Sequence, residues 1–203
     1  MPKTKEQFEQ IKEERKKAIL DAALYLFAVE GYDAVTSDSI TKKVGCSHGL
    51  LYHYFRTKEE LFEYLVLNVV VRNYLEIIKD VNPNQSPKPY MKDLLDSYLN
   101  ALKQPDIKYA CSLYLLLNLH LQKKLFIKIQ QATAQGKKKL FDIVQKKIEE
   151  GQKIGELKDF NPTKMVIALF ACLKGLSYTR IHLEEGLFIC PDVDIIIRMI
   201  ADD

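Results

Sequence analysis

Long apolar runs are absent from this sequence of 203 residues. No stretch reaches the ~18 continuous apolar residues of a membrane span. The N-terminal segment is rich in Lys, Glu and Gln and lacks the apolar core of a signal peptide. We therefore expect a cytoplasmic protein with no membrane partner. Because 47% of the residues are hydrophobic, the chain can bury a core of ordinary size without covalent staples.

A marked excess of one charge is also missing. The 30 basic and 27 acidic residues leave a formal net charge of +3, which is too small to indicate a nucleic-acid partner from composition alone. The four cysteines form no Cys-x-x-Cys pair and have apolar neighbours. We expect neither disulfides nor zinc, and no metal or cofactor.

The alternating pattern of β-strands is not sustained anywhere, whereas apolar residues recur at three- and four-residue spacing almost throughout. This pattern predicts an all-α fold. The expected helices cover residues 5–30, 36–44, 47–55, 57–79, 89–103, 106–121, 122–151, 162–185 and 192–201. The prolines and asparagines of residues 81–89 predict a surface loop between two of them.

Two short helices separated by a tight turn stand out between Thr36 and Phe55. Thr36 and Ser47 are residue types that cap helix N-termini, and Gly45 with Cys46 forms the turn. Thr57 and Glu60 have the spacing of a capping box at the start of the next helix. This arrangement predicts a helix-turn-helix, whose second helix enters the major groove of double-stranded DNA.

The outer face of the second helix carries small and hydrogen-bonding side chains. Gly49 allows close approach to the groove, while His48, Leu50 and Tyr52 are suited to base edges or a thymine methyl. Hydroxyl, imidazole and ammonium groups around them are suited to phosphates. The predicted DNA-binding residues are Thr36, Ser37, Lys43, Ser47, His48, Gly49, Leu50, Tyr52, His53 and Lys58. Residues 1–60 contain ten basic and ten acidic side chains, so the expected footprint is local.

An ordered set of residues extends through and beyond this segment: Ile19, Ala22, Ala23, Phe27, Gly31, Tyr32, Thr36, Ile40, Val44, Gly45, Ser47, Gly49, Leu51, Tyr52, Tyr54, Phe55, Lys58, Glu59 and Leu61. The set resembles the DNA-binding domain of the TetR family of bacterial repressors. The resemblance implies phosphate contacts from Thr36, Tyr52, His53 and Lys58, and base contacts from His48, Gly49 and Leu50. Thr41 departs from the family, which usually has alanine there.

The resemblance also implies two domains: a three-helix DNA-binding domain at residues 1–56 and a larger helical domain at 57–203 for effector binding and dimerisation. Small side chains line one side of residues 162–185, and the last helix is rich in isoleucine. The expected homodimer interface contains Ala168, Ala171, Cys172, Gly175, Thr179, Ile196 and Ile200. Ordinary packing within one chain is the alternative reading of these residues.

Residues 109–121 are apolar almost all round, which predicts a buried central helix. Its polar side chains either pair inside the protein or orient a ligand in a cavity. The expected effector pocket contains Tyr98, Tyr114, Asn118, His120 and Phe170, although aromatic residues at helical spacing are more often simply core.

The sequence therefore predicts a DNA-binding transcriptional repressor that a small, mainly apolar effector releases from a palindromic operator. The alternative is a TetR-like DNA-binding protein without a small effector, controlled by a protein partner or organising DNA. An enclosed apolar cavity in the larger domain would distinguish the two. An enzyme is not expected: no nucleophile with a base stands out, and His48 and His53 lie about 140° apart on a helix, unlike a two-histidine metal face.

Overall fold

The computed structural model describes residues 5–118, 127–184 and 186–202. Every regular element in these ranges is helical, as predicted. The elements are α1 (Lys5–Val29), α2 (Ser37–Val44), α3 (His48–Tyr54), α4 (Lys58–Leu65), the π-helix η1 (Val66–Val70), α5 (Val71–Ile78), α6 (Pro87–Lys103), α7 (Lys108–Asn118), α8 (Ile127–Lys153), α9 (Pro162–His182) and α10 (Val193–Ile197). None of the described helices is both long and apolar enough to cross a membrane.

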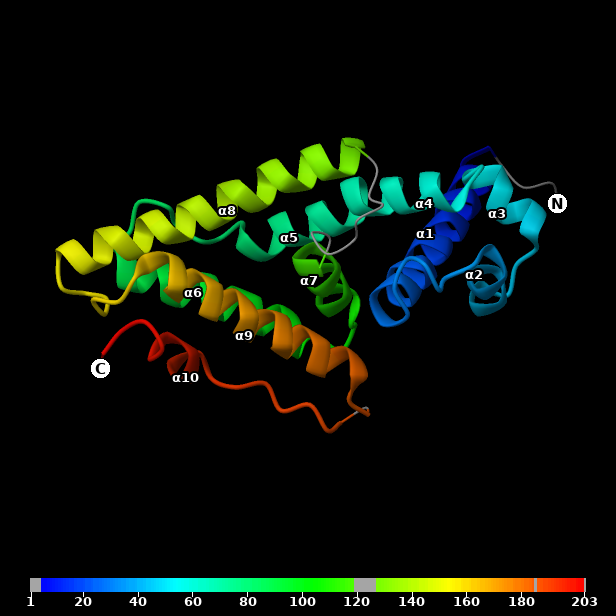
Figure 1. Cartoon of the computed structure of the whole chain (residues 1–203). Coiled ribbons are helices and arrows are strands. Elements are labelled where there is room, and N and C mark those ends of the chain that lie inside the picture. The colour runs from blue at the N-terminus through cyan, green and yellow to red at the C-terminus, as the bar shows by residue number, and fades with distance from the viewer. Residues whose placement is uncertain (1–4, 119–126, 185, 203) are drawn as a thin grey trace.

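The first three helices form one end of the molecule (Figure 1). The continuous run of α4, η1 and α5 leads from that end into the larger bundle, in which α6, α7, α8 and α9 pack against one another. Short α10 packs on α6 near the opposite end. The α2–α3 pair is therefore carried at one tip of an elongated helical body.

The helix boundaries follow local backbone chemistry. Gly31, with φ of +82°, follows α1 in a left-handed conformation that glycine adopts without steric cost. The Thr57 hydroxyl accepts from the Glu60 N–H at 3.0 Å, as the predicted cap requires. The return contact differs, because the Glu60 carboxylate accepts from the backbone N–H of Arg56 at 2.8 Å.

The predicted continuous helix at 57–79 is interrupted by a π-helical turn at Val66–Val70. Val66, Val69 and Val70 are all buried there. A π-helical turn inserts one extra residue in the hydrogen-bond ladder, which rotates the faces of the helices on either side. Periodicity alone did not reveal it because the apolar spacing continues through the turn.

The helix predicted to begin at residue 89 begins two residues earlier, so Pro87, assigned to the surface loop, belongs to α6 instead. Pro87 and Pro89 lie in the first turn of α6, where a missing backbone N–H costs no intrahelical bond. The loop is thus shorter than predicted. The last helices are also shorter than expected: α9 ends at His182, and α10 covers only Val193–Ile197.

A single apolar core extends through the molecule. α1 packs on α2 and α4 on one side and on α7 on the other, and buried residues from Ile19 to Ala201 form one cluster. The division into domains at residue 56 remains a prediction, since this core is continuous across it. One buried polar contact joins α5 to α7: the Asn73 amide donates to the Ser112 hydroxyl at 2.9 Å.

We predict that Ser112→Ala lowers the free energy of unfolding by about 1–3 kcal/mol, because it leaves the buried Asn73 amide without its acceptor. Denaturant unfolding of the full chain measures this change. The double variant Asn73→Leu with Ser112→Ala should lose less than the sum of its single changes. Exposed Asn100→Ala is the control, with an effect within about 0.5 kcal/mol. An equally small effect of Ser112→Ala would contradict the prediction.

Candidate DNA-binding site and ligand cavity

Helix α2 is fixed at both ends. The Thr36 hydroxyl accepts from the Ser39 N–H at 3.1 Å, and the Ser39 hydroxyl accepts from the Thr36 N–H at 3.1 Å. Gly45, with φ of 72°, closes the helix with its N–H directed to the Thr41 carbonyl. These caps satisfy backbone groups that a helix of eight residues otherwise leaves to water. Thr36 is therefore a structural cap as well as a predicted phosphate contact.

Helix α3 is too short to be stable alone, since isolated helices of this length are marginal in water. Ser47 caps it by accepting from the Leu50 N–H at 3.3 Å. Leu51 and Phe55, each 3% exposed, anchor it to the core, and burying such side chains contributes about 1.5–3 kcal/mol each. Tertiary packing thus sets the orientation of α3.

The opposite face of α3 is open. Gly49, Tyr52 and His53 are exposed and Leu50 is half-buried. The Tyr52 hydroxyl donates to the Ser37 hydroxyl of α2 at 3.4 Å. The structure therefore brings together Ser37, Ser47, His48, Gly49, Leu50, Tyr52 and His53 on one surface formed by the start of α2 and by α3. Their contacts with DNA remain predictions.

A second link between the two helices involves residues that sequence reasoning did not assign to the site. The His48 Nε2 lies 3.2 Å from an Asp38 carboxylate oxygen and 3.4 Å from the Thr41 hydroxyl. Asp38 was not predicted, because an acid beside DNA is unfavourable to phosphates. The sequence held one local indication of this contact: Asp38 and Thr41 are three residues apart and therefore lie on one face of α2.

Lys58 has a different environment from the one expected. Its ammonium donates to the carbonyls of Tyr32 and Val35, at 2.9 and 2.8 Å, and lies over the Tyr32 ring. The Tyr32 hydroxyl in turn donates to Glu59 at 3.0 Å. Two of the three ammonium donors thus tie the α1–α2 turn to α4, so a phosphate contact is left to the third.

Lys43 is directed toward the supporting helix. Its ammonium lies over the Tyr25 ring of α1, 3.8 Å from the ring centroid. In this position the charge is used in a cation–π contact, unlike the hydroxyl and imidazole groups on the α2–α3 surface. The predicted phosphate contact of Lys43 requires the side chain to leave this ring.

Comparison with known proteins shows which protein family this pair of short helices resembles. Residues 19–65, which include α2, α3 and α4, match the family described as bacterial regulatory proteins, tetR family. Residues 19–65 are therefore a DNA-binding segment of the TetR family. The α2–α3 pair is the helix-turn-helix of a DNA-binding regulatory protein, and the predicted resemblance is confirmed.

Two relatives of this chain are named as transcriptional regulators. It is 29% identical over 161 residues to the uncharacterized HTH-type transcriptional regulator YhgD of Bacillus subtilis, covering 73% of this chain and 75% of YhgD. It is 36% identical over 84 residues to IcaR of Staphylococcus aureus, described as a negative transcriptional regulator of the biofilm operon icaADBC. That match covers 41% of this chain and 43% of IcaR.

Solved structures show that the fold extends beyond the matched segment. AibR, crystallised in complex with isovaleryl coenzyme A and operator DNA, superimposes with a TM-score of 0.69 at 17% identity. The superposition covers 91% of this chain and 94% of AibR. At that identity the likeness establishes the architecture of the larger domain.

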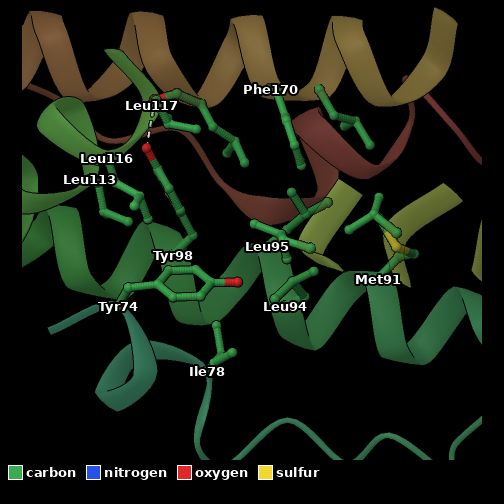
Figure 2. A pocket seen from close by; sticks show the side chains of 14 residues that line it. Tyr74, Ile78, Met91, Leu94, Leu95, Tyr98, Leu113, Leu116, Leu117 and Phe170 are labelled. Carbon is green, nitrogen blue, oxygen red and sulfur yellow. Dashed lines mark hydrogen bonds between the residues drawn. The ribbon is translucent and has the colours of Figure 1, made fainter. Parts of the chain in front are cut away.

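The larger helical part of the chain contains a small apolar cavity of about 50 Å³. Its walls come from α5, α6, α7, α8 and α9 (Figure 2). Phe170 points into it from α9, and Tyr98 borders it from α6. The Tyr98 hydroxyl, however, is directed to α9, where it donates to the Leu173 carbonyl at 2.8 Å and contacts the Ser177 hydroxyl. Burial raises the pKa of this phenol, which stays protonated.

Other members of the predicted effector pocket lie elsewhere. Tyr114 does not line the cavity; its ring packs against Tyr178 at 5.7 Å and near His182, both of which are exposed. The prediction that Tyr114 lines an effector pocket therefore finds no support in this cavity, because the side chain packs against α9 instead. Asn118 ends α7, and His120 lies outside the described residues. Tyr74 of α5 also lines the cavity. It was not predicted, because its helix was expected only to connect the two domains.

The predicted dimer residues separate into two groups. Ala168, Ala171, Gly175 and Thr179 are exposed on one face of α9, and Cys172 is half-buried beside them. Ile196 and Ile200 are 4% and 1% exposed, since the last helix packs on α6 of its own chain. Packing within one chain, the alternative reading, therefore accounts for Ile196 and Ile200, whereas Ile195 and Met199 beside them are 62% and 40% exposed.

We predict that Tyr52→Phe weakens binding to every DNA sequence alike, by about fivefold, because it removes the hydrogen bond that the Tyr52 hydroxyl is predicted to make to a phosphate. The salt dependence of binding should not change, since a phenol releases no counterion. His48→Ala is the contrasting variant and should alter base preference. Titration of matched and mismatched duplexes measures both effects. Loss confined to one sequence in Tyr52→Phe would contradict the sorting of contacts.

Proposed function

We propose that this chain is a dimeric transcriptional repressor that binds a near-palindromic operator through the α2–α3 surface. One observation carries this proposal: α3 presents its first residues outward while Leu51 and Phe55 hold its other face in the core. Residues at the start of a recognition helix contact base edges. The similarity to IcaR, named as a negative regulator, supports repression.

The DNA contacts divide by chemistry. The hydroxyls of Ser37 and Tyr52 and the imidazole of His53 suit phosphates, and the backbone donors at the starts of α2 and α3 add to them. His48, Gly49 and Leu50 face the bases. No net positive charge is needed, because these groups are gathered on one small surface.

Dimerisation is proposed through the outer face of α9. Ile167, 58% exposed, and Tyr178, 49% exposed, lie on the same face as the small residues Ala168, Ala171 and Gly175. A Cβ added at Gly175 would meet nothing within 4 Å, so the chain itself does not require glycine there. Small side chains with flanking apolar ones allow a partner helix to approach closely.

An apolar effector is proposed to bind in this cavity, and the small volume of the cavity sets a condition on how it binds. Its volume of about 50 Å³ is well below the roughly 300–1,000 Å³ of common ligand pockets. An apolar effector must therefore push the walls apart. Because Tyr74 and Ile78 of α5 form one wall, that movement reaches α4 through η1 and changes the position of α3.

The small size of the cavity favours a second candidate function: a TetR-type DNA-binding protein without a small effector, controlled by a protein partner. In that case the apolar walls are core packing. The two candidates share the DNA-binding surface and differ only in what relieves repression.

Selection of bound duplexes from a random DNA pool tests the DNA-binding proposal. We predict enrichment of a near-palindrome whose half-sites lie about 34 Å apart, one helical turn, because a two-fold dimer presents two copies of α3. Recovery of no common sequence would overturn the proposal. Enrichment of one isolated half-site would retain DNA binding and overturn the dimer.

A screen of small apolar compounds against the operator-bound protein distinguishes the two candidates. Val144 lines the cavity from α8. We predict that a releasing compound becomes about tenfold less potent on Val144→Leu, which fills part of the cavity, with operator affinity unchanged. Ile143→Leu, at the exposed neighbouring position, is the matched control. Release that is insensitive to Val144→Leu would place the effector elsewhere, and a screen without any releasing compound would support the second candidate.

A further inference from the structure

The first residue of α3 is linked to α2 through one ring nitrogen. The His48 Nε2 lies 3.2 Å from an Asp38 carboxylate oxygen and 3.4 Å from the Thr41 hydroxyl oxygen. Its ring also lies beside the Tyr52 ring, with centroids 6.3 Å apart. The imidazole is therefore held between α2 and the next turn of α3, although its side chain remains 51% exposed.

The hydrogen on Nε2 can be assigned from the partners. An ionised carboxylate only accepts hydrogen bonds, so Asp38 requires a donor. The Thr41 hydroxyl donates its own hydrogen to the Asp38 backbone carbonyl at 3.1 Å, which leaves that oxygen as an acceptor toward His48. Both neighbours therefore place the hydrogen on Nε2.

A neutral imidazole with hydrogen on Nε2 has a lone pair on Nδ1. Among the described residues, no hydrogen bond involves His48 Nδ1. In the major groove, hydrogen-bond donors come from the exocyclic amino groups of cytosine and adenine, whereas guanine N7 and O6 and thymine O4 only accept. An accepting Nδ1 therefore distinguishes between these two classes of base.

We propose that Asp38 and Thr41 are specificity-determining positioning residues: they fix the His48 tautomer so that its Nδ1 accepts a hydrogen bond from cytosine N4 or adenine N6 on the nearer DNA strand. This inference rests on the proposed DNA-binding function. It also explains an acidic residue at the edge of a surface that faces phosphates. The negative charge of Asp38 weakens attraction to DNA in general while orienting one base-reading group.

The Asp38 side chain is 86% exposed in the free protein, so water competes for its hydrogen bond there. Docking in the groove excludes that water and strengthens the contact. Asp38→Asn offers a sharp test, because the amide can present an N–H to Nε2 and so permit hydrogen on Nδ1. His48 would then donate, and its preference would change toward guanine or thymine.

The experiment repeats the random-pool selection at pH 8, where free imidazole is neutral. His48→Ala identifies the base pair that His48 reads. At that position the wild-type chain should prefer cytosine or adenine by about fivefold, the ratio expected of one hydrogen bond. Asp38→Asn and Thr41→Val should reduce this preference below about twofold or reverse it, with other positions of the site unchanged.

Two matched variants control for charge and volume. Asp33→Asn removes one acid from the exposed α1–α2 turn, and Thr41→Ser keeps the hydroxyl; both should retain the wild-type preference. Because Thr41 is buried, a thermal melt of Thr41→Val accompanies the selection, and the exposed Asp38 variant tests the inference independently of folding.

Unchanged preference in Asp38→Asn, with preference lost in His48→Ala, would overturn the role of the positioning residues. A wild-type preference for guanine or thymine at the His48 position, or no effect of His48→Ala at any position, would also overturn it. Failure of the wild-type chain to enrich any sequence is a separate result, which contradicts the proposed function and this inference with it.

Discussion

The packing of α1 determines where the recognition helix lies. α1 contacts α2 and α4 on one side and α7 on the other, so the helix-turn-helix and the cavity-bearing bundle share one apolar core. Helix α3 has only seven residues and depends on this core through Leu51 and Phe55. A displacement of α7 or α5 cannot be absorbed locally in a close-packed interior, and it changes the support on which α3 rests.

Polar contacts add to the apolar core in setting the orientation of α2 and α3. The Thr36 and Ser47 caps determine where α2 and α3 begin, the Lys58 ammonium closes the α1–α2 turn, and the His48 link joins the two helices. The caps contribute about 0.5–2 kcal/mol each, whereas the exposed His48–Asp38 contact contributes little to stability alone. Together they restrict the orientation of a surface that must match a DNA groove.

The sequence predicted the all-α fold and the helix-turn-helix because caps, glycine turns and apolar spacing are local signals. The first three helices were placed to within a residue or two. The π-turn at Val66–Val70, the burial of Ile196 and the packing of Tyr114 against Tyr178 could not be predicted in this way. They depend on which helix packs against which, and apolar spacing does not distinguish a face covered by the same chain from one left for a partner. The Lys58 and Asp38 contacts likewise depend on tertiary neighbours.

Hydrogen exchange of the full chain with and without a selected duplex tests the central claim most directly, since backbone amides report which segment DNA covers. The account predicts protection concentrated in residues 36–58, at the start of α2, through α3 and at the start of α4. Protection confined to the larger domain, with residues 36–58 exchanging as in the free protein, would contradict it.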